Sequence, residues 1–367
     1  MKIGVKLVTT ISVFNLIGIG LLAGVTLMLS RAEITRLVDK HAESIAIQSS
    51  KTIQNWLNEH IDPVRTLAHV MEAYKKIPPE QRRDYCNLML LQVALKNPTL
   101  AGVYANWSPN GLDGMDEAYA NTPGTDETGR YIPSWGVVDG KPIVRPIQGF
   151  SWEMLTYMPA FGEEYILDPA VYPFAAGNLL IANIGVPVRD PDTSAVIGVI
   201  GNVIVLSTIQ AIVEEIKPFG NGHAMVFSSG GIIAAHQDPS RIGKNIRDSE
   251  TDTFGPFLDT MVTAVTEGTP ASFSYQPPQS DTVIQYYAVP FTVGYASNPW
   301  TMVVGVPRNT IMAPVYQMLR FCALIGFLSM ILMSIGVFSM ARSISRPINT
   351  LAGLLKDISK GDLTKTI

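Results

Sequence analysis

Two stretches of the chain are apolar and carry no charged residue. Phe321 to Met340 is long enough for an α-helix, rising ~1.5 Å per residue, to cross a hydrocarbon core ~30 Å thick. Leu7 to Ser30 is a second such stretch, preceded by Lys2 and Lys6. A cleaved signal peptide is its rival interpretation, but the run exceeds an apolar core of ~7–15 residues and has no A-x-A-like cleavage site. We therefore expect two transmembrane helices, 7–30 and 321–340.

Basic residues at the ends of these helices predict their orientation. Lys2 and Lys6 precede the first helix, and Arg342 and Arg346 follow the second. Because positive flanks stay in the cytoplasm, both termini (1–6 and 341–367) are expected there. The intervening residues are then periplasmic or extracellular, and the protein is expected in the cell (inner) membrane. Besides the membrane, we expect a second copy of the chain as a partner. Gly20 and Gly24 form a G-x-x-x-G pattern that allows two helices to approach closely.

The residues after the first span have a helical pattern. Apolar positions between 31 and 75 recur at intervals of three, four and their sums, which predicts one long stalk helix. These positions are Ile34, Val38, Ile45, Ile53, Trp56, Leu57, Val64, Leu67 and Met71. A second helix is expected from about Pro79 to Lys96.

Strands and turns follow this helical region. The apolar runs 179–188 and 195–206, separated by RDPDTS, predict an antiparallel hairpin. A helix at 207–216 leads to a second hairpin that turns at Gly230 and Gly231. We expect an α/β (α+β) fold with antiparallel sheets in two lobes, at 76–216 and 217–306, and a linker at 307–320 before the second span.

Composition narrows the possible functions. The chain has 47% hydrophobic and 16% charged residues and a formal net charge of -4, and it lacks a basic cluster, so nucleic acid is not an expected partner. Cys86 and Cys322 lie in segments expected in different environments, so the outer portion is expected to fold without an intrachain disulfide.

Sequence patterns for catalysis and metal binding are missing. The five histidines form no H-E-x-x-H, and the chain has no G-x-S-x-G elbow or Walker loop. The acidic residues of the 108–129 segment do not follow calcium-loop spacing. A membrane-anchored extracytoplasmic enzyme is therefore disfavoured, and we predict no catalytic residue, metal or cofactor.

The order of these parts resembles the double Cache sensor domain of bacterial chemoreceptors and sensor kinases. The resemblance is carried in the first lobe by WSPNGLDGMD, GRYIPSW, YPFAAGN and GVPVRDPDTSAVIGVIGNVIV. In the second lobe it is carried by GHAMVFSSGGIIAAHQDPSRIGKNI, YYAVPF and PWTMVVGVP. It implies two PAS-like Cache lobes on a long helix, with a small-molecule ligand bound in the membrane-distal lobe, 76–216.

The segment after the second span resembles the first helix of a HAMP domain. It reads SISRPINTLAGLLKDISKGDLTKTI and places Ile344, Ile348, Leu351, Leu355 and Ile358 on one stripe. The sequence stops before a second HAMP helix, so we expect an output domain beyond it. The resemblance implies a methyl-accepting chemotaxis receptor working with a cytoplasmic kinase and adaptor. A histidine kinase or a cyclic-di-nucleotide enzyme is the alternative output.

Aromatic and polar residues gather in the first lobe and are candidates for ligand contact, since small-molecule pockets combine aromatic walls with a few polar groups. They are Tyr131, Trp135, Trp152, Tyr104, Tyr165, Asp168, Tyr172, Arg130 and Arg145. The resemblance favours Trp135 and Tyr131, because their strand is similar to the one that lines the family's pocket. Each aromatic taken singly is as compatible with core packing.

The ligand class is left open between a carboxylate, an amine and a neutral heterocycle. The amino-acid-binding version of the family has an arginine two residues before a tryptophan, a tyrosine after it and an aspartate in the last strand. Here Arg130 is five residues before Trp135, Gly136 follows it, and the last strand reads Gly201, Asn202, Val203 where G-x-D is expected. An α-amino acid is therefore less expected. Asp168 would suit a cation, and Arg130 or Arg145 an anion.

Overall fold

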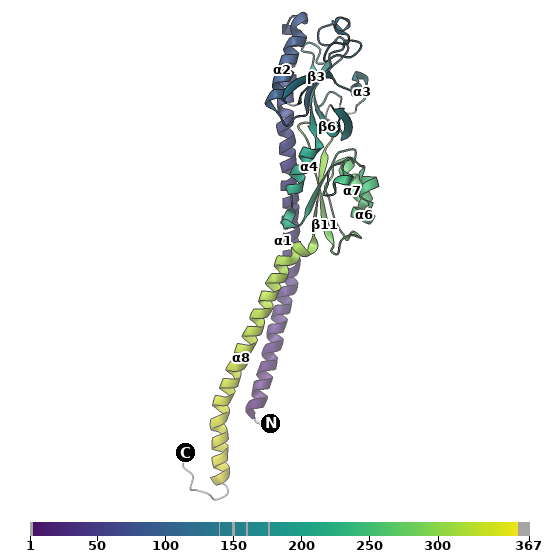
Figure 1. The fold of residues 1–367 in the computed structure, drawn as a ribbon. Helices are drawn as coiled ribbons and strands as arrows, with labels where there is room; N and C mark the ends of the chain where they lie inside the picture. The colour runs from purple at the N-terminus through teal and green to yellow at the C-terminus, as the bar shows by residue number, and fades with distance from the viewer. Residues whose placement is uncertain (1–2, 139, 149–150, 159–160, 175–176, 359–367) are drawn as a thin grey trace. The chain divides into compact units, whose positions relative to one another are not determined.

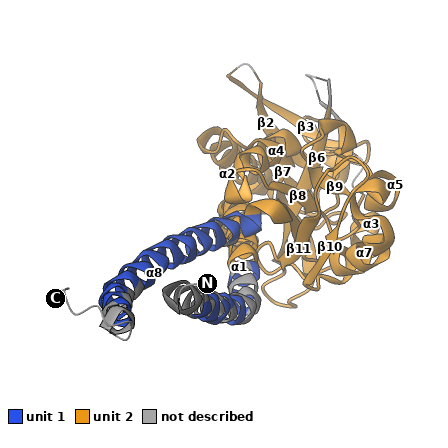
Figure 2. Ribbon diagram, turned by 90° about the horizontal axis from the view of Figure 1, so that it is seen from below, with its two compact units in different colours: residues 1–40, 311–367 blue, residues 41–310 orange. Residues whose placement is uncertain are grey.

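The computed structural model describes residues 3–138, 140–148, 151–158, 161–174 and 177–358. It divides into two compact units, coloured separately in Figure 2. Unit 1 comprises Met1–Lys40 and Ile311–Ile367, and unit 2 comprises His41–Thr310.

Unit 1 is built from the first part of helix α1 (Ile3–Met71) and most of helix α8 (Arg308–Ile358). Within α8, the segment Arg308–Gly353 is long enough to cross a membrane and contains an 18-residue window with a mean hydropathy of 2.4. Most large apolar side chains from Phe321 to Met340 are exposed, as expected for a surface that faces lipid. The predicted first span, 7–30, lies in α1, where the structure describes the helical backbone and only some side chains, so it stays a prediction.

Replacing Gly326 by arginine should impair membrane integration. A Cβ added at Gly326 meets nothing within 4 Å, so the substitution has no steric cost in the helix itself. A charge near the middle of a span costs ~2.5–3.5 kcal/mol on insertion scales. A tag fused after α8 should be accessible to protease from the cytoplasmic side in the Gly326→Leu control, and part of the Gly326→Arg population should lose this accessibility. Identical accessibility of the tag in both variants would contradict a transmembrane assignment for α8.

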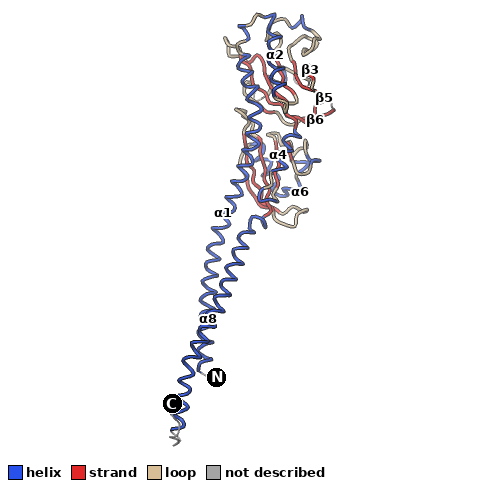
Figure 3. Tube along the Cα trace, turned by 60° about the vertical axis from the view of Figure 1, so that its left-hand side comes forward, coloured by secondary structure: helices blue, strands red, loops and turns tan. Residues whose placement is uncertain are grey.

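The part of α1 in unit 2 carries two antiparallel sheets along one face, as Figures 1 and 3 show. That face is a buried apolar stripe made of Ala42, Ala46, Ile53, Leu57, Ile61, Val64, Leu67, Ala68 and Met71. Intervals of three, four and seven place most of these residues on one side of the helix. Most of the residues between them are polar or charged, as the exposed opposite side requires.

The first sheet belongs to the lobe that follows α1 and α2 (Arg82–Lys96) in the chain. Its strand order is β3-β2-β1-β7-β6-β4, with β5 also paired to β6. The strands are β1 Gly102–Trp107, β2 Pro133–Val138, β3 Lys141–Pro146, β4 Tyr165–Ile166, β5 Ala170–Phe174, β6 Gly177–Arg189 and β7 Val196–Val205. Helix α3 (Trp152–Thr156) lies in the segment between β3 and β4. Strands β6 and β7 form the predicted hairpin.

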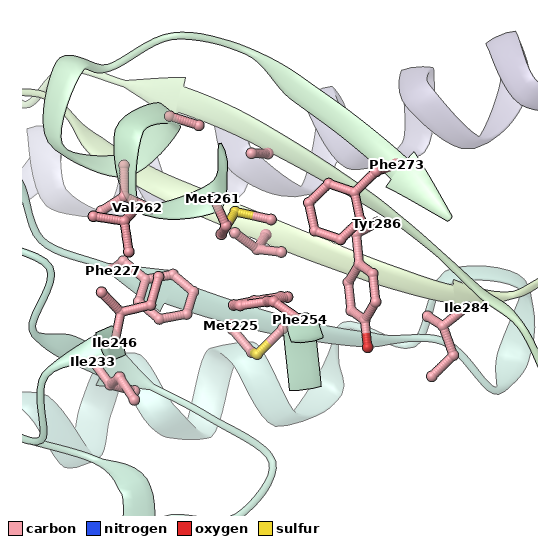
Figure 4. Packing of buried hydrophobic residues seen from close by; sticks show 14 residues of the cluster. Met225, Phe227, Ile233, Ile246, Phe254, Met261, Val262, Phe273, Ile284 and Tyr286 are labelled. Atoms are coloured by element: carbon pink, nitrogen blue, oxygen red, sulfur yellow. The ribbon is translucent and has the colours of Figure 1, made fainter. Parts of the chain in front are cut away.

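The second sheet has the order β10-β11-β12-β8-β9. Its strands are β8 His223–Phe227, β9 Ile233–Ala235, β10 Ala271–Tyr275, β11 Ile284–Phe291 and β12 Trp300–Pro307. Its helices are α4 Leu206–Glu215, α5 Ile246–Ser249, α6 Thr251–Phe254 and α7 Leu258–Glu267. Figure 4 shows the core, where Phe254, Phe273 and Tyr286 pack against the aliphatic residues of α7 and β8. The predicted mixed fold with antiparallel sheets is confirmed.

The two lobes contact each other through the segment around β4. The Glu164 carboxylate accepts from the Arg65 guanidinium (Nη2 to Oε2, 2.8 Å) and from the backbone N–H of Tyr295 (2.8 Å). Asn298 donates to the Ile166 carbonyl (2.6 Å), and Asp168 accepts from the Gly230 N–H (3.0 Å). Burial opposes ionisation of Glu164, but the hydrogen bonds from Arg65 and Tyr295 outweigh it and lower its pKa. The carboxylate is thus held charged between the lobes.

Candidate ligand-binding site

A cavity of about 320 Å³ lies on the face of the first sheet that α1 and α2 do not cover. The register of the strands creates it, because paired residues of neighbouring antiparallel strands point to the same face. Ser134 pairs with Arg145, and Asn183 pairs with Val203, so all four side chains are on this side. The lining residues are Ala101, Ser134, Gly136, Val138, Ile143, Arg145, Pro146, Ile147, Gln148, Tyr172, Ile181, Asn183 and Val203.

Two buried tyrosines pack on the same sheet face next to the cavity. The Tyr104 hydroxyl donates to the Ile184 carbonyl (3.2 Å) and lies 3.4 Å from the Tyr165 hydroxyl. The rings lie against Gly201 and Gly185, where an added Cβ would come within 2.3 Å of a tyrosine Cζ atom. Burial raises the pKa of both phenols, which therefore remain neutral. Together with Ile181 and Val203 they form an apolar core under this side of the lobe.

Among the described lining residues, Arg145 carries the charge. Arg145 is exposed, and among the described residues it has no ion-pair partner. The described lining residues include no aspartate or glutamate. The Asn183 side chain is 5% exposed, and its amide oxygen accepts no hydrogen bond from a described residue. A buried acceptor without a partner is costly, so this oxygen favours a ligand that carries a donor.

Trp135 and Tyr131, which the sequence favoured most, do not line this cavity. Trp135 lies between Ser134 and Gly136 on β2, and successive strand residues point to opposite faces. Its indole N–H donates to the Asn87 side chain on α2 (3.1 Å). The Tyr131 hydroxyl donates to the same oxygen (2.9 Å). Both residues therefore attach the sheet to α2 behind the cavity.

The other predicted site residues are divided between the cavity and structural positions. Arg145 and Tyr172 line the cavity, and Trp152 packs against the apolar core beside it. Arg130 is buried and pairs with Asp126 four residues earlier (3.3 Å), so its charge is already neutralised. Asp168 is not among the described lining residues and accepts from the Gly230 N–H in the second lobe, so it is not placed as a cation partner in this cavity.

Asn202 also lies outside the cavity. It is paired with Val103 and Ile184, on the sheet face that meets α1, and its side-chain N–H donates to the His60 carbonyl (2.5 Å). Val203, which stands where the G-x-D pattern has its aspartate, does line the cavity, so an ammonium group there gains no carboxylate from this position. The sequence argument missed Ser134, Gln148 and Asn183. Asn183 had a recognisable signal, because it is the polar residue inside the apolar run LLIANIGV.

A family model described as a Cache domain, dCache_1, matches residues 30–315. Methyl-accepting chemotaxis protein TlpQ of Pseudomonas aeruginosa is 25% identical over 304 residues, 74% of this chain and 41% of its own length. Methyl-accepting chemotaxis protein PscA of Pseudomonas syringae pv. tomato is 22% identical over 340 residues, 92% of this chain and 46% of its own length. The chain spans less than half the length of these relatives.

Solved structures share the fold of the outer region. The periplasmic sensory domain of the Campylobacter jejuni chemoreceptor Tlp1 has a TM-score of 0.58 and 17% identity, covering 77% of this chain and 99% of that one. The extracellular domain of mmHK1S-Z3, a proposed histidine kinase, has a TM-score of 0.59 and 23% identity. The match covers 75% of this chain and 99% of that domain. At these identities the likeness concerns the fold.

Proposed function

The chain belongs to the Cache domain family, and on this premise we propose that it is the sensing and transmembrane half of a chemoreceptor that binds a small anion in its first lobe. The observation that carries the proposal is Arg145, which lines the cavity without an ion-pair partner among the described residues, and whose described neighbours in the lining include no carboxylate. Two relatives of the chain are methyl-accepting chemotaxis proteins, which supports a sensory role over a catalytic one.

The cavity chemistry favours a carboxylate over the other ligand classes. A guanidinium binds a carboxylate through two parallel hydrogen bonds, which a neutral heterocycle or an amine does not reproduce. Ser134 and Gln148 can complete the contacts of the anion, and Asn183 accepts from a hydroxyl or amide N–H elsewhere on the ligand. A volume of about 320 Å³ fits a small molecule at the lower end of typical ligand pockets. A small carboxylate with one hydrogen-bond donor satisfies all of these groups.

Ligand binding would be transmitted through β4. Tyr165 packs in the apolar core beside the cavity, and its neighbours Glu164 and Ile166 both contact the second lobe. We propose that the lobes have two arrangements, which differ in the contacts of Glu164 and Ile166 with the second lobe. A ligand that binds one arrangement more tightly, through Tyr172 and the adjacent core, would shift the equilibrium toward it. The shift equals the difference in binding free energy between the two arrangements, ~1–3 kcal/mol in typical allosteric coupling.

The signal would then pass through the second lobe to α8. The lobes 76–216 and 217–306, the linker 307–320 and the span 321–340 are the parts that we propose for this route. Residues 341–367 would begin a HAMP domain, and the described side chains of Ile344, Ile348 and Leu351 are exposed there, as an unpaired bundle helix requires. The partners would be the membrane, a second copy of the chain, and a cytoplasmic kinase and adaptor.

A histidine kinase sensor is the second candidate function. The fold of the outer region is shared with the extracellular domain of mmHK1S-Z3. A chemoreceptor and a histidine kinase would use the Cache lobes in the same way. The two candidate functions therefore differ in the output domain. Reconstituting the full-length receptor with a chemotaxis kinase and adaptor decides between them: ligand-dependent change in kinase activity supports the chemoreceptor, and autophosphorylation of the receptor itself supports the alternative.

The experiment that tests the ligand proposal is isothermal titration calorimetry of the purified chain in nanodiscs. The panel contains small hydroxycarboxylates, amides, amines, α-amino acids, purines and sugars. We expect saturable binding from the hydroxycarboxylates. Saturable binding of amines or purines, with no heat from any carboxylate, would contradict an anion site.

A further inference from the structure

A second cavity, of about 210 Å³, lies in the lobe that contains β8 to β12. It borders the apolar core of that lobe, because Ile284 and Tyr286 belong both to its lining and to the core cluster. An apolar cavity of roughly 150 Å³ holds benzene, so a cavity of this size can hold a molecule of about six to eight non-hydrogen atoms. All of its described lining residues lie between 223 and 286, so it is separate from the cavity of the first lobe.

Gly305 on β12 leaves room for two rings on the sheet face that meets this cavity. It pairs with His223 on β8 and with Tyr286 on β11, and paired residues of neighbouring strands point to the same face. A Cβ added at Gly305 would lie 2.4 Å from His223 Nε2 and 3.0 Å from Tyr286 Cε1. The two rings meet edge to face, with their centroids 5.9 Å apart. The missing side chain at Gly305 therefore lets both rings reach the cavity.

The Tyr286 hydroxyl is a polar group that hydrogen-bonds to none of the described residues, although Tyr286 is only 1% exposed. Its ring packs against Phe254 and Phe273. Figure 4 shows the hydroxyl at the end of the ring that points away from Phe273. Burial, and then the charges of Glu250 and Asp252, raise the pKa of Tyr286, so the phenol keeps its proton. A buried hydroxyl without a partner is costly, so it favours a ligand that bonds to it.

His223 adds a neutral imidazole beside this hydroxyl. Burial, and then the charge of His236, lower the pKa of His223 to about 4. The ring is therefore uncharged between pH 5 and 8, where an ordinary imidazole changes charge. Neither of its nitrogens hydrogen-bonds to a described residue, so the ring offers one donor and one acceptor.

The charged side chains of the lining are already paired. Arg241 donates to Glu250 (3.1 Å) and Asp252 (2.9 Å), and its Nε lies 3.6 Å from an Asp238 carboxylate oxygen. His236 Nδ1 accepts from the Asp238 N–H (2.8 Å), and its Nε2 lies 3.6 Å from Glu250 Oε1. The described residues contain no group of three or more His, Cys, Asp or Glu side chains that could hold a metal ion. An anion would have to displace an existing pair to reach Arg241.

The groups of the lining that remain available are neutral. Besides Tyr286 and His223 they include Gln279, whose side-chain N–H donates to Asp252 (2.7 Å) while its amide oxygen accepts from no described residue. A hydroxyl group matches this set, because it donates and accepts at once, as the phenol and the neutral imidazole do. A molecule with several hydroxyls can therefore bond to more than one of these groups.

We propose that this cavity is a second ligand site, which binds a neutral polyol of about three or four carbons through the Tyr286 hydroxyl and the His223 imidazole. The proposed ligand differs in charge from the carboxylate of the first lobe, so the two sites select different molecules. The site adjoins β12, whose last residue, Pro307, directly precedes α8. A ligand bound here would act on the strand that leads to the membrane-spanning segment.

The test is an NMR titration of the full chain in nanodiscs with erythritol, in which the imidazole signals of isotope-labelled histidine are followed. The signal of His223, assigned by its loss in His223→Gln, should shift and saturate. The signal of His69, which is exposed on α1, should not move. A butanediol with only the two terminal hydroxyls should bind at least about 5-fold more weakly, because it makes fewer hydrogen bonds. Glycerol phosphate should bind no more tightly than glycerol, since no free cation awaits its charge.

Tyr286→Phe is the variant that tests the site itself, because it removes the hydroxyl and keeps the ring in the apolar cluster. It should weaken erythritol binding about 3- to 10-fold, the effect of one neutral hydrogen bond. Tyr275→Phe is the matched control: Tyr275 packs against the same cluster from β10 and is not among the described lining residues. The affinity of Tyr275→Phe for erythritol should change less than twofold.

Three results would overturn the proposal. The first is a His223 signal that neither glycerol nor erythritol shifts. The second is equal affinity of Tyr286→Phe and the native chain for erythritol, which also decides the matter if His223→Gln does not fold. The third is tighter binding of glycerol phosphate than of glycerol, since Arg241 would then select the ligand by charge.

Discussion

Replacing Arg145 by glutamine should weaken binding of the small anion by about 10- to 100-fold, because hydrogen bonds to a charged group contribute ~1.5–3 kcal/mol. The lower end applies if solvent screens the exposed guanidinium. Arg145→Lys should recover part of the loss, since an ammonium keeps the charge but not the two parallel donors. The measurement is calorimetric titration of the best ligand against each variant.

A matched control lies on the same strand. Lys141 is exposed on β3 and does not line the cavity, so Lys141→Gln removes one positive charge without removing a contact. The affinity of the Lys141→Gln variant for the ligand should change less than twofold. Equal losses of affinity in Lys141→Gln and Arg145→Gln would indicate that a long-range electrostatic field, and not a direct contact, attracts the ligand. Trp135→Phe should keep native affinity, because the indole contacts Asn87 behind the sheet.

Replacing Arg83 by methionine should lower the free energy of unfolding by ~3–5 kcal/mol, the usual cost of breaking a buried ion pair. Arg83 is 5% exposed and pairs with Asp113 (2.6 Å) and Asp116 (2.8 Å). It also donates to the Gly129 carbonyl (2.9 Å) and lies over the Tyr119 ring. Methionine would leave two buried carboxylates without a cation. The measurement is the midpoint of denaturant unfolding followed by circular dichroism.

The neighbouring Arg82 provides the control for this prediction. Its guanidinium donates to the backbone carbonyls of Ile77 and Leu112, and no carboxylate depends on it. Arg82→Met should therefore cost ~1–2 kcal/mol, the value of neutral acceptors left without a partner. If both variants were destabilised by less than 1 kcal/mol, the Arg83 cluster would not be what fixes the 108–132 segment to α2.

The fold could be predicted from the sequence because its main signals are local. The spacing of apolar residues from Ile53 to Met71 determines one buried helix face, and the turn RDPDTS determines the β6–β7 hairpin. The same is true of the apolar stretch in α8, whose length and composition suffice. Such patterns require no knowledge of which elements meet in space.

The candidate site was predicted less well because it depends on long-range contacts. The sequence favoured the aromatic residues Trp135 and Tyr131 as ligand contacts. In the structure, both side chains donate to Asn87 on α2 and so face that helix. The alternation of β2 already indicated that Ser134 and Trp135 face opposite sides, although not which side holds the cavity. Arg130 could have been excluded, since Asp126 lies four residues away. Arg145 was predicted and does line the cavity.

The pairing of Asp168 with Gly230 had no signal in the sequence. The two residues are 62 positions apart, in different lobes. Likewise, the Gln210 amide on α4 donates to the His236 carbonyl, although no motif connects the two residues. Contacts of this kind follow from how turns pack against a sheet or against the other lobe, which only the folded structure specifies.

The central claim is that a charge contact with Arg145 selects the ligand. Its most direct test is calorimetric comparison of the best-binding carboxylate with its neutral carboxamide, which has nearly the same shape. The account predicts that the carboxamide binds at least 10-fold more weakly to the native chain, and that Arg145→Gln abolishes this difference. Equal affinity of the acid and its amide for the native chain would contradict it.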